Sequence, residues 1–296
     1  MRILISLILS FSLCSVAHSG GCDSNTGILL HGDGTDGSTT FTDEGCNGTA
    51  KTVASTNGSP NIDTTYKEFG TASIEFLSAT ADYIRYLDST DWDILDNTTS
   101  SRGIDLWARH LTHTGEEGYF WQSESATKRY FFRHNGGAGL IFYAQFDGTA
   151  VHSGYISEIS DSNWHHLAVI KIADDVGIYK DGTQVGYVDV SGAGATGTLA
   201  GSFFVGYATY SGMNGNIDEF RVQNSDYFGA TPNSTPDDSI TVPTVAYSTS
   251  ATRQRLVMGT TYDKGFMYQV KKERFKLEGG GYSDAKTINY WFSHSG

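Results

Sequence analysis

Adjacent acidic residues are the first groups in this chain that could do chemistry. Retaining glycoside hydrolases use two carboxylates about 5 Å apart, one as acid and base and one as nucleophile. On a strand, two side chains share a face only at positions such as i and i+2 or i+4. Glu116-Glu117 and Asp218-Glu219 are direct neighbours, so the members of each pair point to opposite faces of a regular strand. Neither pair predicts a hydrolytic site.

The histidine pair His165-His166 suggests metal binding, because imidazole is a common metal ligand. Neighbouring residues on a strand face opposite ways, so both rings would not bind one ion. The chain also has no G-x-S-x-G, H-E-x-x-H or P-loop motif. The sequence therefore predicts no catalytic residue, and we expect a protein that is not an enzyme.

A segment rich in Gly, Asp and Thr, residues 31–48, is typical of a loop. Its carboxylates Asp33, Asp36 and Asp43 have two interpretations. They could hold turns, or they could act as hard oxygen ligands for a divalent cation. The composition of the segment leaves both open.

Residues 119–146 form a block that is dense in aromatic side chains. They predict three antiparallel strands, separated by E-S-A-T and N-G-G-A-G. One face of these strands must pack against the core, and rings on the other face often mark a contact surface. Tyr119, Trp121 and Tyr143 are the candidate ligand-binding residues, with sugars as natural partners. The alternative is that both faces are covered and the rings only fill a thick sandwich.

The elements that would position these groups are β-strands joined by short turns. Residues 163–171, N-W-H-H-L-A-V-I-K, alternate as a strand does, with His165 and Leu167 on one side and His166 and Ala168 on the other. Asp181-Gly182 lies between two strand-like runs. It predicts a type I′ hairpin, because that turn needs positive φ at both central residues.

Four motifs taken together resemble the laminin-G-like (LamG) domain of bacterial and phage type, a concanavalin A-like jelly roll. They are N-W-H-H-L-A-V (163–169), Y-K-D-G-T-Q-V-G (179–186), F-V-G-Y (204–207) and G-N-I-D-E-F-R-V (215–222). Weaker matches extend the resemblance over roughly residues 27–238. It implies an all-β fold, a two-sheet antiparallel jelly-roll sandwich without a substantial helix in residues 60–225.

In such a sandwich each sheet buries one face of alternating apolar residues. The expected core includes Ile74, Phe76, Ala168, Ile178, Val205 and Phe220. Residues 103–110, G-I-D-L-W-A-R-H, occupy the place of a family strand, but both of their faces carry apolar residues. The pattern does not settle which of these faces is buried.

The resemblance also implies a calcium site, because LamG-like and related jelly rolls often hold one Ca²⁺ where the first loop meets the terminal I-D-E strand. The matching residues are Asp43 and Asn47 in the loop and Asp218 and Glu219 in the strand. On a regular strand at most one of the last two should be a direct ligand. The alternative is that Asp218 caps a turn or pairs with Arg221.

The first residues predict export. Met1-Arg2 is a positive n-region, residues 3–13 are apolar, and Ala17-His18-Ser19 is a small-x-small cleavage site. Residues 1–19 are thus an expected signal peptide, and no later apolar run is long enough to span a membrane. In an oxidising compartment Cys22 and Cys46 are expected to pair, and two free thiols are the alternative.

The chain has 296 residues and a formal net charge of −13, which argues against nucleic acid as a partner. Residues 20–238 form the expected LamG-like domain. Residues 239–296 differ in composition, with eight Lys and Arg against four Asp and Glu. They predict a small β-rich extension of unknown role, with short strands in R-L-V-M-G, F-M-Y-Q-V and I-N-Y-W-F.

The resemblance implies a secreted recognition or adhesion module that binds glycans or an extracellular protein surface, either free or attached to a cell or virion surface. The same fold serves glycoside hydrolases and polysaccharide lyases, so a sugar-cleaving enzyme is the first alternative. The E-x-D-x-x-E motif of jelly-roll glucanases is absent, however. A structural or assembly protein is the second alternative.

Overall fold

The computed structural model describes residues 21–77, 82–148, 150–191, 196–209 and 211–249, together with three strand backbones between residues 255 and 293. The expected signal peptide, residues 1–19, lies outside the described residues. The chain divides into two compact units, Met1–Thr249 and Ser250–Gly296.

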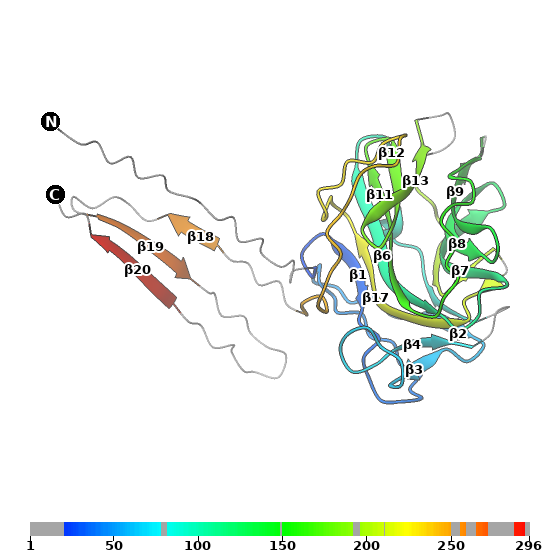
Figure 1. Ribbon diagram of the computed structural model, residues 1–296, viewed down its shortest axis with the longest axis horizontal. Helices are drawn as coiled ribbons and strands as arrows, with labels where there is room; N and C mark the ends of the chain where they lie inside the picture. Colours follow the sequence, from blue (N-terminus) through cyan, green and yellow to red (C-terminus); the bar gives the residue numbers. More distant parts are fainter. Residues whose placement is uncertain are drawn as a thin grey trace. The chain divides into compact units, whose positions relative to one another are not determined.

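The first unit is built from two antiparallel sheets that face each other (Figure 1). The eight-stranded sheet has the order β13-β12-β11-β6-β17-β4-β3, and β1 pairs with β17 beside β4. Its strands are β1 (Thr26–Leu30), β3 (Asn61–Asp63), β4 (Ser73–Phe76), β6 (Ser101–His110), β11 (Trp164–Ile172), β12 (Asp175–Lys180), β13 (Thr183–Asp189) and β17 (Gly215–Gln223).

The opposing seven-stranded sheet has the order β10-β9-β8-β7-β14-β5-β2. Its strands are β2 (Ser55–Asn57), β5 (Tyr83–Tyr86), β7 (Glu116–Ser125), β8 (Lys128–Asn135), β9 (Gly139–Phe146), β10 (Val151–His152) and β14 (Ser202–Val205). A short hairpin, β15 (Tyr207–Ala208) and β16 (Ser211–Gly212), follows β14. The expected all-β jelly-roll sandwich is confirmed.

Helix is almost absent from the described part of the chain. Its one helical element is η1, a 3-10 turn over Thr90–Trp92, and Ser89 caps this turn by accepting from the Asp91 N–H. None of the described helices has the length and apolar character needed to cross a membrane.

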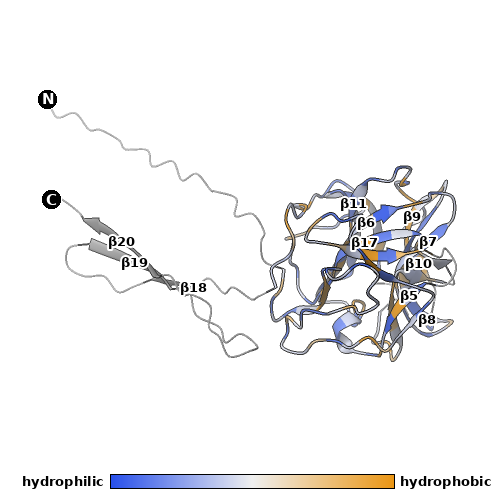
Figure 2. Ribbon diagram, turned by 90° about the horizontal axis from the view of Figure 1, so that it is seen from below, coloured by the Kyte–Doolittle hydropathy of each residue, from blue (hydrophilic) through white to orange (hydrophobic). Residues whose placement is uncertain are grey.

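The core lies between the two sheets, and hydrophobic residues on the strands of both layers supply it (Figure 2). At its centre are rings from both sheets. Phe120 of the seven-stranded sheet lies 5.6 Å from Phe132 and 6.4 Å from Phe220 of the other sheet, measured between ring centroids. Five of the six expected core residues lie in this cluster, and Ala168 is the exception.

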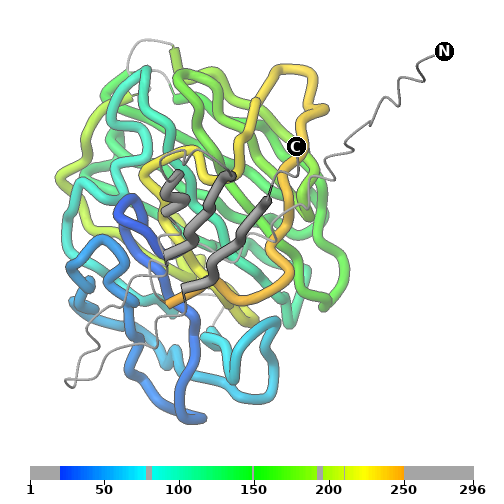
Figure 3. The backbone as a smooth tube through the Cα atoms, turned by 90° about the vertical axis from the view of Figure 1, so that its left-hand side faces the viewer, coloured from blue at the N-terminus to red at the C-terminus, as the bar shows by residue number. Residues whose placement is uncertain are grey.

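Ala168 is buried on the outer face of the eight-stranded sheet instead. There it packs with Ile170, Tyr179 and two residues that follow the last strand of the sandwich, Ala230 and Ile240. The segment of residues 224–247 crosses this face (Figure 3, yellow to orange). Strand β11 is therefore covered on both sides, which explains why its two faces are equally apolar.

Residues beyond 238 belong to the same compact unit. Ser239 bridges to Thr183, and the Ile240 N–H donates to the Gly182 carbonyl. Tyr247 is 3% exposed and packs with Leu29 and the disulfide. The structural boundary after Thr249 thus lies beyond the compositional boundary at residue 238.

Two local predictions are confirmed. Asp181 and Gly182 have φ values of 50° and 83°, and they connect Lys180 to its partner Thr183 as a two-residue hairpin loop. The cysteines Cys22 and Cys46 form a disulfide with an S–S distance of 2.09 Å.

The hairpin also gives His165 two acidic partners. Its Nδ1 lies 2.7 Å from Asp181 Oδ2, and its Nε2 lies 3.1 Å from Asp161 Oδ1. The hydrogen bond to Asp181 is the largest cause that raises the pKa of His165, and burial opposes it. The ring thus has an electrostatic role at this hairpin.

We expect His165→Gln to remove one pH-dependent contribution to stability. A histidine with a raised folded pKa stabilises fully below its unfolded pKa of about 6.5, and this stability is lost as pH rises through the folded value. The two carboxylates are about half exposed, so the effect should stay below about 1 kcal/mol. Urea denaturation between pH 5.5 and pH 8 measures it. If the free energy of unfolding changes with pH in the same way in wild type and variant, the assignment is contradicted.

The second unit contains a three-stranded antiparallel sheet, β18 (Arg255–Met258), β19 (Gly265–Lys271) and β20 (Thr287–Ser293). Strand β19 is central and pairs with β18 along one edge and with β20 along the other. The three short strands expected in this region are therefore present.

Candidate functional site

A row of aromatic residues runs across the seven-stranded sheet, one from each of four neighbouring strands. Phe204 (β14) is opposite Trp121 (β7), Trp121 is opposite Phe131 (β8), and Phe131 is opposite Tyr143 (β9). We call these four residues the aromatic row. Register alone places them side by side, because directly opposite residues have their Cβ atoms about 4.5–5.5 Å apart.

The aromatic row lies on the outer face of the sheet. The strand neighbours of its members, among them Phe203, Gln122, Phe132 and Phe142, are fully buried on the inner side. Trp121, Tyr143 and Phe204 are partly exposed, and Phe131 is 5% exposed. The outward-facing rings of residues 119–146, together with Phe204, thus form one continuous aromatic surface across four strands.

Tyr119, the third predicted ligand-binding residue, does not belong to this face. It is 0% exposed in the core, and its hydroxyl lies 2.8 Å from His110 Nε2. A β-bulge between Gly118 and Phe120 is the reason. Strict alternation would place Tyr119 on the same side as Trp121, but the extra residue of a bulge breaks that alternation.

The rings of the row contact one another in pairs. Trp121 and Phe204 are stacked with centroids 5.3 Å apart, and Phe131 and Tyr143 are stacked at 4.9 Å. Tyr83 meets Phe204 edge to face at 5.2 Å. These contacts hold the rings in place, so a ligand would meet a rigid apolar surface rather than mobile side chains.

Hairpin β15–β16 forms a wall at one side of the row. Tyr207 lies 5.7 Å from Trp121, and Ala208 packs with Phe131 and Ile141. The hairpin approaches β7 so closely at Gly118 that an added Cβ atom would lie 2.0 Å from the Ala208 nitrogen. Glycine at this position is what lets the wall sit on the sheet.

Polar and cationic side chains border the aromatic row. On one side, the aligned outward positions of β14, β7, β8 and β9 are Ser202, Ser123, Arg129 and Gln145. On the other side, Arg133 is opposite Ile141. Arg85 (β5) and His152 (β10) are the partners at the two ends. None of these positions carries a carboxylate.

The four residues expected to hold calcium each have at least one oxygen that accepts a hydrogen bond from the protein. Asp43 accepts from the backbone N–H groups of Leu29 at 2.9 Å and Lys51 at 2.6 Å. Asn47 Oδ1 accepts from the Thr49 N–H at 3.2 Å. In the described part of the chain, no three His, Cys, Asp or Glu side chains gather in a way that could hold a metal ion.

The acidic pair on β17 is also hydrogen-bonded within the protein, although Asp218 Oδ1 is buried without a partner among the described residues. Asp218 Oδ2 accepts from the N–H groups of Glu68 and Phe69 at 2.9 and 3.0 Å. Glu219 bonds to His31 Nδ1 at 2.7 Å and accepts from the Tyr247 N–H at 2.9 Å. A bulge with φ of 49° at Glu219 lets both neighbours be buried, which a regular strand would not allow.

These hydrogen bonds argue against the calcium site, which stays a prediction from the sequence. The carboxylates of the first loop serve turns in the same way: Asp33 accepts from the Ala72 N–H at 3.1 Å, and Asp36 from the Thr64 N–H at 3.1 Å. Of the two interpretations of this loop, the described contacts favour the structural one.

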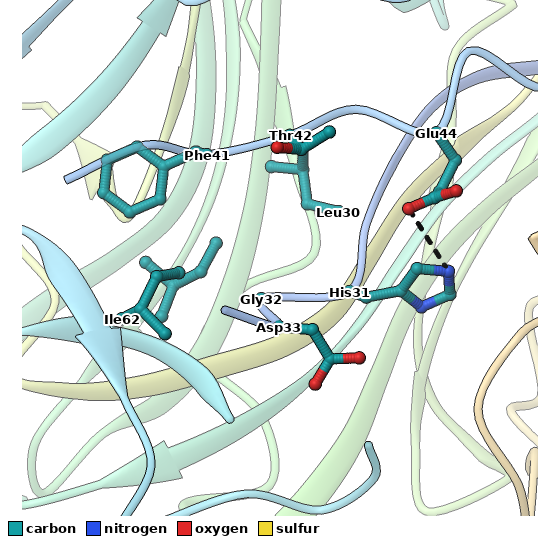
Figure 4. Close-up of a pocket in the computed structure, with 9 residues that line it drawn as sticks. Leu30, His31, Gly32, Asp33, Phe41, Thr42, Glu44 and Ile62 are labelled. Carbon is teal, nitrogen blue, oxygen red and sulfur yellow. Dashed lines mark ion pairs between the residues drawn. The ribbon is translucent and has the colours of Figure 1, made fainter. Parts of the chain in front are cut away.

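A small cavity of about 40 Å³ lies beside this region, lined by Leu30, His31, Gly32, Asp33, Phe41, Thr42, Glu44, Ile62 and Ile74 (Figure 4). His31 Nε2 lies 4.0 Å from Glu44 Oε1. Burial lowers the pKa of His31, but the hydrogen bond and charge of Glu219, with help from Glu44 and Asp33, raise it above the usual value. The cavity is large enough for about one water molecule.

We expect Asp218→Asn to stabilise the protein at neutral pH. Burial raises the pKa of Asp218 to about 7, although the Phe69 and Glu68 N–H groups oppose this. Because the folded pKa exceeds the unfolded one, stability is lost as pH rises from about 4 to about 7. An asparagine does not titrate, so the variant avoids this loss. Its free energy of unfolding at pH 7 should exceed that of the wild type by at least about 1 kcal/mol, which corresponds to about 2–4 °C in melting temperature. Thermal melts from pH 4 to pH 8 test this, and a gap that stays constant with pH would contradict it.

A family model described as the concanavalin A-like lectin/glucanases superfamily matches residues 79–227. These residues include all four strands that carry the aromatic row, and also strand β17. No curated protein is similar enough in sequence to count as a relative.

The solved structures that resemble this chain do so at low sequence identity. The binding domain of botulinum neurotoxin DC, in complex with SialylT, is 10% identical with a TM-score of 0.50, over 68% of this chain and 48% of that one. The chain thus spans about half the length of that toxin domain. Domain 4 of a GH43 extracellular arabinanase from Geobacillus stearothermophilus, in complex with arabinotriose, is 15% identical (TM-score 0.46, 68% and 93% covered). Mouse laminin alpha1 LG4-5 is 11% identical (TM-score 0.40, 58% and 45% covered).

Proposed function

Because this chain belongs to the concanavalin A-like lectin/glucanase superfamily, we propose that it is an extracellular, non-catalytic module that binds glycans. The binding surface is the outer face of the seven-stranded sheet, with Trp121, Tyr143 and Phe204 as its exposed rings. The disulfide Cys22–Cys46 supports an oxidising, extracellular location.

One observation carries this proposal: the aromatic row is continuous over four strands, and hydroxyl, amide and guanidinium groups border it. Sugars have apolar C–H faces and polar edges. Aromatic side chains suit the faces, and a few placed polar groups fix the edges. The outer face of the eight-stranded sheet is a poorer candidate for glycan binding, because residues 224–247 pack against it.

A second surface depression is less suited to binding a glycan. It is a cleft of about 380 Å³ between residues 39–43 and 50–53. Its lining includes four threonines but a single aromatic residue, Phe41, which is itself 7% exposed. Without exposed rings it offers little to the apolar face of a sugar.

The proposal excludes hydrolysis at the aromatic row on chemical grounds. Cleavage with retention or inversion needs two carboxylates that flank the scissile bond. The outward positions beside the row are Ser, Gln, Arg, His or Ile, and the nearby Glu116 is engaged by Arg133 and Ser211. A ligand on this face would therefore meet no pair of carboxylates of the kind that these hydrolases use.

A glycan array with the full chain, followed by reducing-end and unsaturated-product assays on each bound glycan, tests the proposal. We expect retention of at least one glycan class without new reducing ends or unsaturated products. Cleavage of a bound glycan would overturn the non-catalytic assignment. Retention of no glycan, together with capture of an extracellular protein, would overturn the glycan assignment in favour of a protein ligand.

A further inference from the structure

Arginines concentrate on the face that carries the aromatic row. Arg85, Arg129 and Arg133 all occupy outward positions of the seven-stranded sheet, next to the row or at its end. The guanidinium carbon of Arg129 lies 5.4 Å from the ring centre of Tyr143, and that of Arg133 lies 5.3 Å from the ring centre of Phe131. The aromatic residues therefore help to hold these cations at the surface.

This clustering runs against the charge of the whole chain, which is −13. In the described residues, three cations outside this face are paired with carboxylates: Lys51 with Asp91, Arg102 with Asp96, and the buried Arg221 with Asp105. On this face Arg133 is paired with Glu116. Arg85 and Arg129, in contrast, have no carboxylate within ion-pair distance among the described residues.

The contacts of Arg85 and Arg129 occupy or bury only the Nε group of each guanidinium. Arg85 Nε donates to Ser202 Oγ at 2.9 Å, and Arg129 Nε is buried without a hydrogen-bond partner among the described residues, so the terminal N–H groups are the donors open to a ligand. A guanidinium carries five N–H donors in a planar fork that matches carboxylate and sulfate oxygens. Two partly exposed arginines without an internal anion suit an anion that comes from outside.

The register sets the distance between the two cations. Arg85 is aligned with the aromatic row on β5, and Arg129 lies two residues off the row on β8, three strands away. With strands about 4.8 Å apart and about 3.3 Å per residue, their Cα atoms are separated by about 16 Å. A ligand that meets both arginines must be an extended chain, and it would cross Phe204 and Trp121 on its way.

We infer that the ligand of this face is an acidic glycan, a chain of sugar units whose carboxylate or sulfate groups bind Arg85 and Arg129 while its sugar rings pack on the aromatic row. This inference rests on the proposed function and specifies the class of glycan. The aromatic row supplies apolar contact to any sugar, and the two arginines select chains that carry negative charge.

Matched probes that differ only in charge test the inference. Isothermal titration of the full chain compares oligogalacturonate with its methyl-esterified form, and dextran sulfate with dextran. We expect an acidic probe to bind at least about tenfold more tightly than its neutral counterpart, because hydrogen bonds to charged groups are stronger than neutral ones. The carboxylate and sulfate pairs separately identify which anion is preferred. Raising the salt concentration from 50 to 500 mM should weaken acidic binding alone.

Variants separate this inference from the proposed function. Arg129→Gln and Arg85→Gln should each weaken acidic binding about tenfold, while Lys180→Gln on strand β12 of the other sheet should change it less than twofold. Equal binding of acidic and neutral probes, or retention of neutral glycans alone, would overturn the inference and leave the proposed function standing. Acidic binding that is lost in the arginine variants but unchanged in Trp121→Ala would overturn the role of the aromatic row instead.

Discussion

Replacement of Arg221 by methionine is expected to lower the free energy of unfolding by about 3–5 kcal/mol, because it leaves Asp105 buried without its cation. Arg221 is 0% exposed, and its Nε donates to Asp105 Oδ1 at 2.9 Å. The rings of Tyr227 and Tyr247 lie 3.8 and 3.9 Å from the guanidinium carbon. This cluster fixes the covering segment, residues 224–247, to the eight-stranded sheet.

The double variant Arg221→Met, Asp105→Asn separates loss of the pair from loss of packing. If the unpaired carboxylate causes the damage, neutralising it should recover part of the loss, and urea denaturation followed by Trp fluorescence measures this. Burial raises the pKa of Asp105, but Arg221, His166 and Tyr247 together lower it below its usual value. A carboxyl with a depressed folded pKa stabilises above about pH 3.9 and loses that stability as pH falls further. The gap between wild type and Arg221→Met should therefore shrink below pH 4. A loss under about 1 kcal/mol at pH 7 would contradict the assignment.

The strands that carry Asp105 and Arg221 could be predicted from the sequence, but the burial of these two side chains could not. Asp105 and Arg221 alternate with apolar residues on β6 and β17, which on an ordinary sandwich strand would place them in solvent. They are buried because the chain returns over the outer face after β17, and Tyr247 Oη donates to Asp105 Oδ2 at 2.5 Å. Contacts this distant in sequence leave no local periodicity. The change in composition near residue 239 reflects none of them, so it marked a boundary too early.

Turns with a local cause were predictable, and bulges were not. Asp181-Gly182 forms the expected hairpin because its conformational requirement is encoded in two adjacent residues. The bulges at Tyr119 and Glu219 each insert one residue into otherwise regular strands, and nothing in Glu-Glu-Gly-Tyr-Phe or Ile-Asp-Glu-Phe indicates the insertion. The first bulge moves Tyr119 from the outer face of the sheet into the core. The second buries both acidic residues that alternation would separate.

The candidate site itself was half visible in the sequence. Trp121 and Tyr143 were identified from the density of rings in residues 119–146, and the structure places both in the aromatic row. Phe204 and Arg85 were missed, because they come from β14 and β5, which are distant in sequence but adjacent in the sheet. Strand order in a jelly roll does not follow chain order, so the row becomes apparent only once β14 is inserted between β7 and β5.

Trp121→Ala should weaken glycan binding by about thirtyfold, equivalent to about 2 kcal/mol, the loss typical of a central aromatic contact residue. Trp121 lies in the middle of the aromatic row, with Phe204 stacked on one side and Phe131 opposite on the other. Its removal takes away the largest ring and also the support that holds Phe204 in position. Isothermal titration with the glycan that the array identifies measures the effect.

Tyr119→Phe is the matched control for this variant. Tyr119 is two residues away on the same strand and was an equal candidate by sequence, but its side chain is buried and its hydroxyl faces His110. Losing that buried hydrogen bond should cost about 1–3 kcal/mol of stability and leave affinity within about twofold. If both variants bind normally, the glycan does not use this face. If Tyr119→Phe binds as weakly as Trp121→Ala while remaining folded, the inner side of β7 contributes to recognition, and the outer row is not its main determinant.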